Sequence, residues 1–315
     1  MIEIIRYTDE YKSTWDEFVK TSKQRLFMFK RNYMEYHSDR FKDHSLLFFD
    51  DDELIALLPL SEHETELRSH GGLTYGGFLT SNKMKQGIMN ECIRCIVKYM
   101  LQNGFSTLLY KPIPHIYHLQ PAEEDLYTLS LYDVTIKGIE ASTVINLQEP
   151  IKMPKGRKAQ ISRAKREGVQ IVTTDNKKDF DEFIDLENSI LRSKHNTNAV
   201  HTSDELYYLK TQFPDNICLY EAIYEDSLVS GCVIYIYDDV VHTQYMAAND
   251  VARRIGALDL IIYSIIEEFR DKKRWLDFGI STENNGAFLN EGLISQKEGF
   301  GGRTNIYSKL MLNVR

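Results

Sequence analysis

Residues 240–280 read VVHTQYMAANDVARRIGALDLIIYSIIEEFRDKKRWLDFGI, and this stretch decides the fold class. It begins and ends with β-rich runs, which favour extended strands. Between them, apolar residues from Leu258 to Phe269 recur at the spacing of an amphipathic helix. Arg253, Arg254 and Gly256 lie in a loop just before that helix. The order of strand, loop, helix and strand predicts an α/β fold.

Two further β-rich runs, NICLYEAIY and LVSGCVIYIY, precede this stretch. Together with VVHTQYMAA they predict an antiparallel meander, because short turns separate the three runs. Upstream of the meander, residues 152–166 carry seven Lys and Arg residues and no acid. This basic segment has a helical pattern that Gly168 ends.

The N-terminal half has a similar order of elements. Residues 45–49 and 54–60 are strand-like and predict a hairpin whose loop is a little longer than the tightest turns. A glycine-rich segment at residues 70–77, a helical pattern from Ile88 to Met100 and the strand-like run FSTLLY follow. The periodicity therefore predicts a pair of similar α/β units.

A chain of 315 residues suggests two domains, each long enough to bury its own core. We expect a seam at residues 142–154, with an N-terminal domain over 1–148 and a C-terminal domain over 149–315. The hydrophobic content of 43% and the charged content of 27% are ordinary for a globular protein. The net charge of -8 argues against general nucleic-acid or membrane-surface binding by the whole chain.

The N-terminal residues lack a basic region followed by an apolar one, so we expect no signal peptide. The apolar stretch at residues 54–60 is too short to span a bilayer. Four cysteines are too few for a disulfide framework in a chain of this size, and the Cys92-x-x-Cys95 pair has no second ligand pair. We expect a cytoplasmic protein with reduced thiols, no membrane span and no metal.

The loop before the helix is the feature that most favours a ligand. Backbone N–H groups at a helix start and two arginines both favour a bound phosphate. An ordinary helix start with two solvated arginines is the alternative. The segment Arg253-Arg254-Ile255-Gly256-Ala257 resembles the pyrophosphate-binding loop of GNAT acyltransferases, whose pattern is Gln/Arg-x-x-Gly-x-Gly/Ala. This chain has Leu258 at the position of the last small residue.

Further segments resemble a FemAB-related branch of GNAT-like proteins and occur in order along most of the chain. They are SHGGLTYGG at residues 69–77, PIPHIYH at 112–118, the basic helix at 157–168, DFGISTE at 277–283, LNEGL at 289–293 and QKEGFG at 296–301. The resemblance implies a tandem pair of GNAT-like domains, each a mixed, largely antiparallel sheet flanked by helices. It implies transfer of an acyl or aminoacyl group to an amine.

Such a transfer needs backbone amides that polarise the donor carbonyl, a base for the amine proton and an acid for the departing thiolate. GNAT folds hold the donor where two neighbouring strands splay, which the resemblance assigns to VHTQYMAA and WLDFGIS. Glu283 is then the expected general base, with Asp277 as the alternative and Tyr307 as the general acid. Glu283 can instead cap the following helix, and Tyr307 can be a packed side chain.

Five residues are expected to contact the substrate: Gln244, Tyr245, Asn290, Lys297 and Tyr75. Asn290 and Lys297 can instead stabilise a local turn, and Tyr75 can belong to a close-packed glycine-rich turn. The acceptor is expected to be a small-molecule amine, with an amino sugar or a cell-envelope precursor as examples. The sequence does not define its identity or the oligomeric state.

The basic helix at residues 152–166 has several interpretations. It is a solvated linker helix, or it holds the phosphates of CoA, an aminoacyl-tRNA donor or an anionic carrier on the acceptor. FemAB-type enzymes use aminoacyl-tRNA and often carry an inserted helical arm, for which the strand-like VQIV from residue 169 leaves no room. We therefore expect acyl-CoA, in the first place acetyl-CoA, as co-substrate. Aminoacyl-tRNA transfer and a non-catalytic binding protein remain the alternatives.

Overall fold

The computed structural model describes residues 1–314, with the side chains of residues 194 and 195 left out. The chain forms two compact units. Unit 1 consists of Met1–Ala141, Thr282–Leu289 and Asn305–Arg315, and unit 2 consists of Ser142–Ser281 and Asn290–Thr304. The chain first passes from unit 1 to unit 2 at the start of the expected seam. Two later segments return to unit 1. A single division at residue 148 does not describe this exchange of segments. The expected domain boundaries stay a prediction.

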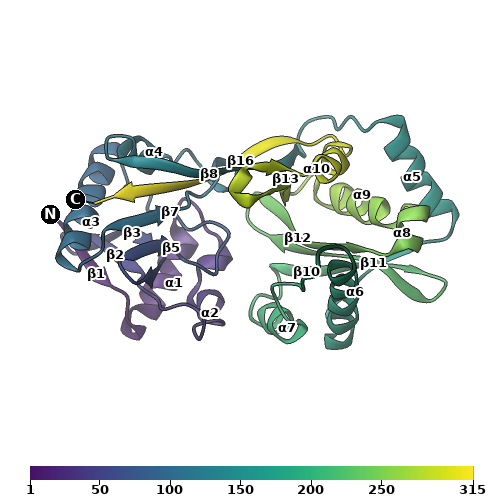
Figure 1. The fold of residues 1–315 in the computed structure, drawn as a ribbon, viewed down its shortest axis with the longest axis horizontal. Coiled ribbons are helices and arrows are strands. Elements are labelled where there is room, and N and C mark those ends of the chain that lie inside the picture. Colours follow the sequence, from purple (N-terminus) through teal and green to yellow (C-terminus); the bar gives the residue numbers. More distant parts are fainter. Residues whose placement is uncertain (315) are drawn as a thin grey trace. The chain divides into compact units, whose positions relative to one another are not determined.

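Unit 1 is an α/β unit with short, mostly antiparallel strands (Figure 1). One sheet has the order β1 (Ile2–Arg6), β2 (Leu46–Asp50), β3 (Glu53–Leu58) and β6 (Leu79–Thr80). Further neighbouring strands are β4 (Leu60–His63), β5 (Glu66–Ser69), β7 (Thr107–Tyr110), β16 (Arg303–Asn313) and β8 (Val134–Asn146). A small separate hairpin contains β14 (Thr282–Glu283) and β15 (Phe288–Leu289).

The helices of unit 1 include the one that the sequence predicts from Ile88 to Met100. They are α1 (Lys12–Thr21), α2 (Arg31–Met34), α3 (Gln86–Gln102) and α4 (Glu124–Leu129), with single turns at Asp9–Tyr11, Phe27–Phe29, His115–Tyr117 and Asn284–Gly286. The buried face of α3 holds Met89, Cys92, Ile96 and Met100, and it packs in one core with the strands. Burial raises the pKa of the Cys92 thiol to about 12. Cys92 therefore belongs to the apolar face of a helix, as its spacing predicts.

The predicted hairpin of unit 1 is present, but its turn is tighter than we expected. Asp50 pairs with Glu53, so only Asp51 and Asp52 make the turn. Asp51 adopts a left-handed φ of 52°, which a two-residue hairpin turn requires. The strand predicted over residues 54–60 is interrupted at Pro59, because proline has no N–H to give to a strand ladder.

Unit 2 contains the predicted antiparallel meander. Its strands lie in the order β8 (residues 142–146), β13 (Trp275–Ile280), β12 (Val240–Ala248), β11 (Ser227–Ile236), β10 (Ile217–Tyr224) and β9 (Gln170–Thr174). All neighbours are antiparallel except β12 and β13, which run parallel. A parallel pair needs a crossover, and the helix between these two strands supplies it.

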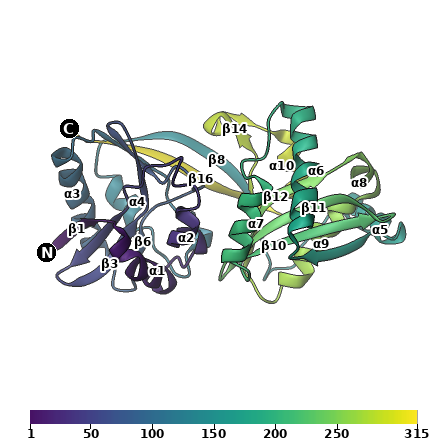
Figure 2. The ribbon, with the colours of Figure 1, turned by 90° about the horizontal axis from the view of Figure 1, so that it is seen from below.

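Helices cover both faces of this sheet (Figures 1 and 2). One face carries α6 (Lys177–His195) and α7 (Ser203–Gln212), and the other carries α5 (Lys155–Arg166), α8 (Asp250–Ile255) and α9 (Ala257–Phe269), while α10 (Glu291–Glu298) follows later. Phe183 of α6 lies so close to Gly231 that a Cβ there would be 2.4 Å from its ring. Gly231 therefore lets α6 approach the centre of the sheet.

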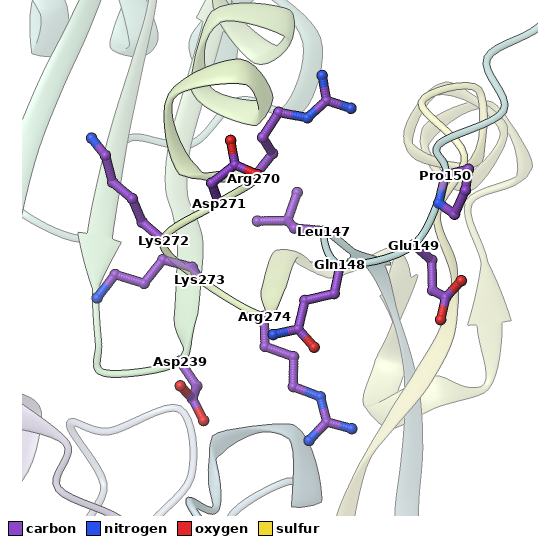
Figure 3. A pocket seen from close by; sticks show the side chains of 10 residues that line it. All are labelled: Leu147, Gln148, Glu149, Pro150, Asp239, Arg270, Asp271, Lys272, Lys273 and Arg274. Carbon is purple, nitrogen blue, oxygen red and sulfur yellow. The ribbon is translucent and has the colours of Figure 1, made fainter.

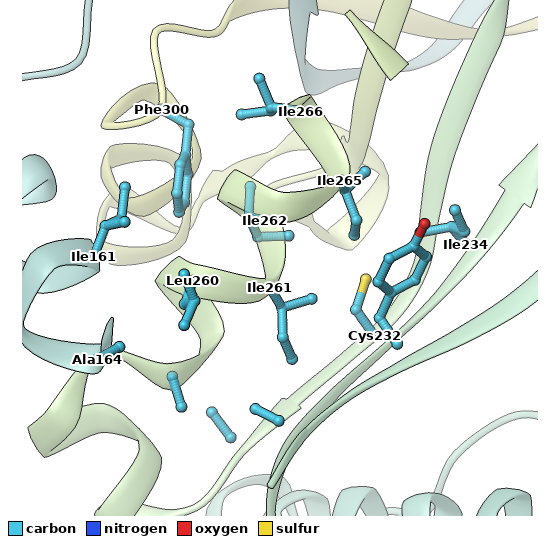
Figure 4. Packing of buried hydrophobic residues seen from close by; sticks show 14 of the residues in the cluster. Ile161, Ala164, Cys232, Ile234, Leu260, Ile261, Ile262, Ile265, Ile266 and Phe300 are labelled. Atoms are coloured by element: carbon cyan, nitrogen blue, oxygen red, sulfur yellow. The ribbon is translucent and has the colours of Figure 1, made fainter. Parts of the chain in front are cut away.

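The core of unit 2 forms around α9 (Figure 4). Its buried side chains are Ala257, Leu260, Ile261, Ile262, Ile265, Ile266 and Phe269. They pack against Cys232 and Ile234 of β11 and against Ile161 and Ala164 of α5. Complete burial of one such aliphatic side chain contributes about 1.5–3 kcal/mol, so α9 fixes both the sheet and α5. Within residues 1–314, no helix has both the length and the apolar character needed to cross a membrane.

Candidate active site

The parallel strands β12 and β13 separate after three paired positions. Val240 to His242 pair with residues 275–277. Beyond that point β12 continues beside β11 as far as Ala248, and β13 continues beside β8 as far as Ile280. The two strands therefore splay immediately after His242 and Asp277. This is the opening that the resemblance assigns to these two segments.

A β-bulge lies on β12 beside this opening. Val233 of β11 faces Tyr245, whereas the next residue, Ile234, faces Thr243. Gln244 is therefore the extra residue of the bulge. A bulge removes a residue from the regular ladder and redirects its backbone groups and side chain, which is why bulges occur next to active sites. Gln244 can thus direct a backbone amide toward a ligand in the opening.

A histidine and an aspartate mark the point where the strands part. Nδ1 of His242 lies 3.4 Å from Oδ2 of Asp277. The other oxygen, Oδ1, accepts hydrogen bonds from Ser142 Oγ at 2.5 Å and from the Gly279 N–H at 2.9 Å. Asp277 is completely buried, whereas 12% of the His242 side chain is exposed. In this geometry the carboxylate orients the imidazole, as in the orienting pairs of nucleophilic and acid–base sites.

Gly279 gives this cluster its backbone shape. Its φ of 69° is left-handed, and a Cβ at this position would lie 3.3 Å from Cε1 of His242. A larger residue would therefore be strained and would press on the imidazole ring. Two hydroxyl groups are also buried beside the opening, on Thr243 and Ser281, and neither has a hydrogen-bond partner among the described residues. Both can bond to a polar group of a ligand.

Lys297, an expected substrate contact, is a buried residue of α10 with only 3% of its surface exposed. Its Nζ donates to the carbonyl oxygens of Gly279 at 2.9 Å and Ile280 at 2.7 Å. Burial lowers the pKa of this amine to about 8, and the nearby Asp277 opposes that shift. Lys297 thus ties α10 to the end of β13, which fits the expected alternative of a local structural role.

The three expected catalytic residues do not lie in the same unit. Asp277 belongs to unit 2, whereas Glu283 and Tyr307 belong to unit 1. Glu283 is exposed in β14. Tyr307 is buried in β16 and packs edge-on against Tyr75, with 5.7 Å between the ring centroids. The structure thus brings Tyr307 together with Tyr75, and it gives Asp277 a buried position behind His242.

The other expected contacts have identifiable local roles. Asn290 caps α10, because its side chain accepts a hydrogen bond from the Leu293 N–H at 3.0 Å. Tyr245 lies three residues past His242, and its hydroxyl hydrogen-bonds to Nδ1 of His201. Gln244 and Tyr245 therefore lie at the opening, whereas Asn290 stabilises the start of a helix.

The expected phosphate loop is a helix. Asn249 caps α8 by accepting from the Ala252 N–H at 2.9 Å, so Arg253 and Arg254 lie on a helical turn and not in an open loop. Arg253 is paired with Asp250 at 2.9 Å. Ile255 and Ala257 on either side of Gly256 are buried. The expectation of a loop was wrong here because an asparagine cap followed by good helix formers starts a helix.

Gly256 itself lies under α5. Its φ is 80°, and a Cβ at this position would be 2.6 Å from the carbonyl oxygen of Gln160. The Arg163 guanidinium of α5 donates to the Arg254 carbonyl of α8 at 2.9 Å, which holds these two helices together. Leu258, at the position of the family's small residue, packs against the core. The glycine thus permits close helix packing, and its expected role in binding pyrophosphate stays a prediction.

The basic helix α5 is more than a solvated linker. Arg157 pairs with Asp259, donates to the Gln296 carbonyl at 2.8 Å and lies 4.1 Å above the Phe300 ring. Its remaining cations include the exposed Lys155, Lys158 and Arg166. The helix therefore has an anchored side and an exposed basic side.

Two cavities of unit 2 lie away from the splayed strands. The larger, of about 630 Å³, lies at the turn between α9 and β13 (Figure 3). It is lined by Leu147, Gln148, Glu149, Pro150, Asp239, Arg270, Asp271, Lys272, Lys273 and Arg274. Lys273 donates to the carbonyls of Tyr237 and Asp238 at 2.6 and 3.0 Å, and the three acids offset much of the positive charge. The other lies between α5 and α9. Neither cavity is lined by a residue expected in catalysis, but residues of the basic helix at 152–166 line the second one.

His242 and Ser142 are the residues of this site that sequence reasoning missed. The signal for His242 was present, because a histidine interrupts the apolar start of the strand assigned to the splay. Ser142 had no signal of its own. Its contact with Asp277 joins residues that are 135 positions apart in the chain.

Part of this chain matches a known family in sequence. Residues 155–285 match the family model described as Acetyltransferase (GNAT) domain. Among curated proteins, none matches the sequence of this chain. A sequence match thus covers much of unit 2, including the splayed strands.

Solved structures resemble the chain over its whole length at low sequence identity. FemX is 10% identical with a TM-score of 0.70, and the match covers 99% of this chain and 97% of FemX. L-PGS from Bacillus licheniformis is 13% identical with a TM-score of 0.64, over 98% of this chain and 93% of that one. A tandem GNAT protein from the clavulanic acid biosynthesis pathway is 11% identical with a TM-score of 0.54, over 100% and 99%. The chain therefore has a GNAT-like, FemAB-related fold, the acyltransferase fold in its tandem form.

Proposed function

We propose that this chain is an N-acyltransferase and that unit 2 carries out the transfer where β12 and β13 separate. The observation that carries the proposal is the pair of His242 and Asp277 beside the Gln244 bulge. The histidine is partly exposed and its carboxylate partner is buried, which is the arrangement of an oriented general base. The backbone at the bulge is suited to polarise a carbonyl group.

In the proposed reaction, the amine nitrogen of the acceptor attacks the carbonyl carbon of the donor. Nε2 of His242 takes the amine proton, while Asp277 holds the Nδ1–H tautomer. The backbone amide at Gln244 stabilises the oxyanion. The carbon–nitrogen bond forms, the bond to the leaving group breaks, and the leaving group receives the proton that His242 took from the amine. Glu283 as base and Tyr307 as acid are the competing assignments.

Acyl-CoA is the proposed donor, with acetyl-CoA as the first choice, because the matching family model describes an acetyltransferase domain. Arg253 and Arg254 are its proposed phosphate contacts. Changing both to alanine is expected to weaken acetyl-CoA binding with little change in stability, because both side chains are exposed. The shift of the melting temperature by acetyl-CoA measures this effect.

Aminoacyl-tRNA is a second candidate donor, and one observation favours it. The carbonyl of Gln160 covers Gly256, so the family's phosphate-binding glycine is packed against α5. The exposed cations of α5 are then free to contact a nucleic-acid backbone. Affinity for charged tRNA that falls steeply with salt, without any shift by acetyl-CoA, would select this donor. A stabilisation by acetyl-CoA alone would select the first.

The acceptor is proposed to be a small-molecule amine, for which an amino sugar and a cell-envelope precursor are the first examples to test. Tyr245 of unit 2 is its proposed contact, and Tyr75 of unit 1 stays a prediction. Release of free thiol from acetyl-CoA across a panel of amines, including nucleotide-linked amino sugars, measures turnover directly. No turnover with any amine, from either acetyl-CoA or charged tRNA, would overturn the proposed function.

Two matched variants separate the possible bases. His242→Gln is expected to lower kcat about 10²–10⁴-fold while donor affinity stays within about twofold, because it removes the base and keeps a polar side chain. Glu283→Gln is the control and is expected to leave kcat nearly unchanged. The reverse result, a large loss in Glu283→Gln and normal turnover in His242→Gln, would assign the base to Glu283.

A further inference from the structure

A groove of about 350 Å³ lies between α5 and α9 within unit 2. It is lined by Ile151, Met153, Lys158, Ile161, Ser162, Lys165, Tyr263, Ile266, Glu267 and Arg270. We call it the α5–α9 groove. Its volume is at the lower end of the range for small-molecule sites, about 300–1,000 Å³. Apart from the α5 cations proposed to contact an aminoacyl-tRNA donor, its lining residues include none of those proposed for acyl transfer.

Apolar side chains form the base of the α5–α9 groove. Ile161 and Ile266 are buried members of the core of unit 2, and Ile151, Met153 and Tyr263 pack against that core. Ile161 and Ile266 lie on α5 and α9 respectively, as Figure 4 shows. A surface groove with such a base favours an aliphatic chain, because binding removes apolar surface from water.

Basic side chains form the rim of the groove. Lys158 and Lys165 are seven residues apart on α5 and therefore lie on the same side of the helix. Nζ of Lys165 lies 4.4 Å from the centre of the Tyr263 ring. Arg270 on α9 pairs with Glu267, the one carboxylate among the lining residues, at 2.9 Å. The lining thus carries three cations and one anion.

This local positive charge stands against the charge of the whole chain, which is -8. Lysines scattered on the surface of an acidic protein would alternate with acids, whereas α5 has none between Lys155 and Arg166. Two lysines beside an apolar groove are complementary to an anion that has an aliphatic part. A phosphate group is the anion best matched to two or three neighbouring cations.

We propose that the α5–α9 groove binds a single molecule of an aliphatic phosphate, with its chain over Ile161 and Ile266 and its phosphate between Lys158 and Lys165. The anionic partner expected at residues 152–166 is then a small amphiphile. A nucleic-acid backbone would contact the exposed cations without filling the apolar base of the groove. Binding that needs the apolar base therefore distinguishes an aliphatic phosphate from a nucleic acid. Binding in this groove does not depend on the proposed acyl transfer.

The test is calorimetric titration of the full chain with octyl phosphate below its micelle concentration. Inorganic phosphate and octanol, which each carry half of the proposed ligand, serve as comparisons. We expect octyl phosphate to bind at least tenfold more tightly than either. Equal binding of octanol or of inorganic phosphate would overturn the proposal, and so would the absence of any binding by octyl phosphate.

Matched variants locate the site. Lys158→Ala combined with Lys165→Ala is expected to weaken octyl phosphate binding about tenfold or more. Lys155→Ala combined with Arg166→Ala removes the same charge from the same helix outside the groove, and it is expected to change binding less than twofold. Equal losses in both pairs would show a general charge effect and overturn the groove as the site.

A third variant keeps both lysines and fills the groove. Ser162 is exposed on α5, so Ser162→Trp is expected to fold normally and to abolish binding. Unchanged binding in Ser162→Trp, with an unchanged melting temperature, would overturn the proposal.

Vesicles of phosphatidylcholine with one-fifth phosphatidylglycerol test the competing ligand, a membrane surface. If the chain sediments with these vesicles but does not bind octyl phosphate, the proposed groove site is wrong and the basic helix adsorbs to a membrane surface instead. All these readouts are independent of donor and acceptor, so loss of turnover does not affect them.

Discussion

Glu187 is a carboxyl group of α6 that the structure buries without a compensating charge. Only 8% of its surface is exposed, and its Oε2 has no hydrogen-bond partner among the residues described. Burial raises the pKa of this carboxyl to about 7. A carboxyl group in the unfolded chain has a pKa close to 4.5, so the folded chain retains this proton over a higher pH range.

The free energy of unfolding should therefore fall as the pH rises from 4.5 to 7, because Glu187 loses its proton less readily in the folded state. Over that range the folded state holds more protons than the unfolded state, which makes the slope with pH negative. Glu187→Gln removes this titration. The free energy of unfolding of the variant should therefore increase by about 2–3 kcal/mol relative to that of the parent as the pH rises from 4 to 8. Urea unfolding at pH 4.5, 6 and 8 measures the difference.

Glu182→Gln on the same helix is the control, because Glu182 is half exposed and pairs with Lys178 at 3.0 Å. The free energy of unfolding of Glu182→Gln should change with pH in the same way as that of the parent. If Glu187→Gln also runs parallel to the parent, Glu187 is ionised in the folded protein and the raised pKa is wrong.

Residue types in the candidate site were partly predictable from the sequence, and their environments were not. Asp277 was expected as an alternative base because it lies in one of the two strands that the resemblance assigns to the splay. Its complete burial depends on Ser142, on the Gly279 N–H and on His242, which come from two other strands and a left-handed turn. A local pattern gives the residue and its strand, whereas burial arises from partners far away in the chain.

Elements with strong periodicity were predictable, and those defined by a cap or by packing were not. The meander β10–β12, α3 and α9 follow from apolar spacing alone. α8 is too short for a periodic signal and depends on the Asn249 cap. The position of α5 on α9 depends on apolar residues of both helices, to which α5 contributes the buried Ile161 and Ala164.

At the scale of elements, Gly256 determines how closely α5 approaches the start of α9. Gly256→Ala should cost about 1–2 kcal/mol for the left-handed backbone and a similar amount for displacing the Gln160 carbonyl. Gly168→Ala is a matched control. It has nearly the same φ, 82°, but no atom within 4 Å of an added Cβ. Thermal or urea unfolding of both variants gives the difference.

We therefore expect Gly256→Ala to lose about 2–4 kcal/mol and Gly168→Ala about 1–2 kcal/mol. Equal losses would mean that α5 moves away from Gly256 at little cost. In that case the covered glycine would no longer argue against an open phosphate site, and acyl-CoA would gain support as the donor.

The whole chain forms its two units from interleaved segments. The tandem fold class was predictable because each half repeats the same order of elements. The return of the C-terminal segment to unit 1 was not. Leu310 to Asn313 of β16 pair with residues 107–110 of β7, and Leu312 is buried in the core of unit 1. Strand periodicity does not encode which distant strand is the partner.

A division at residue 148 should therefore separate strands that need each other. A fragment of residues 149–315 lacks Ser142 to Asn146, which pair with β13 and supply the hydroxyl that bonds to Asp277. It should show no cooperative thermal transition. A fragment of residues 142–304 keeps this strand together with all of unit 2, so it should unfold cooperatively by circular dichroism. The matched fragment 149–304, which differs only by the seven residues at its start, should lose that transition. Cooperative unfolding of 149–304 with the stability of 142–304 would show that β8 is dispensable for unit 2, and a domain boundary at residue 148 would then be the better description.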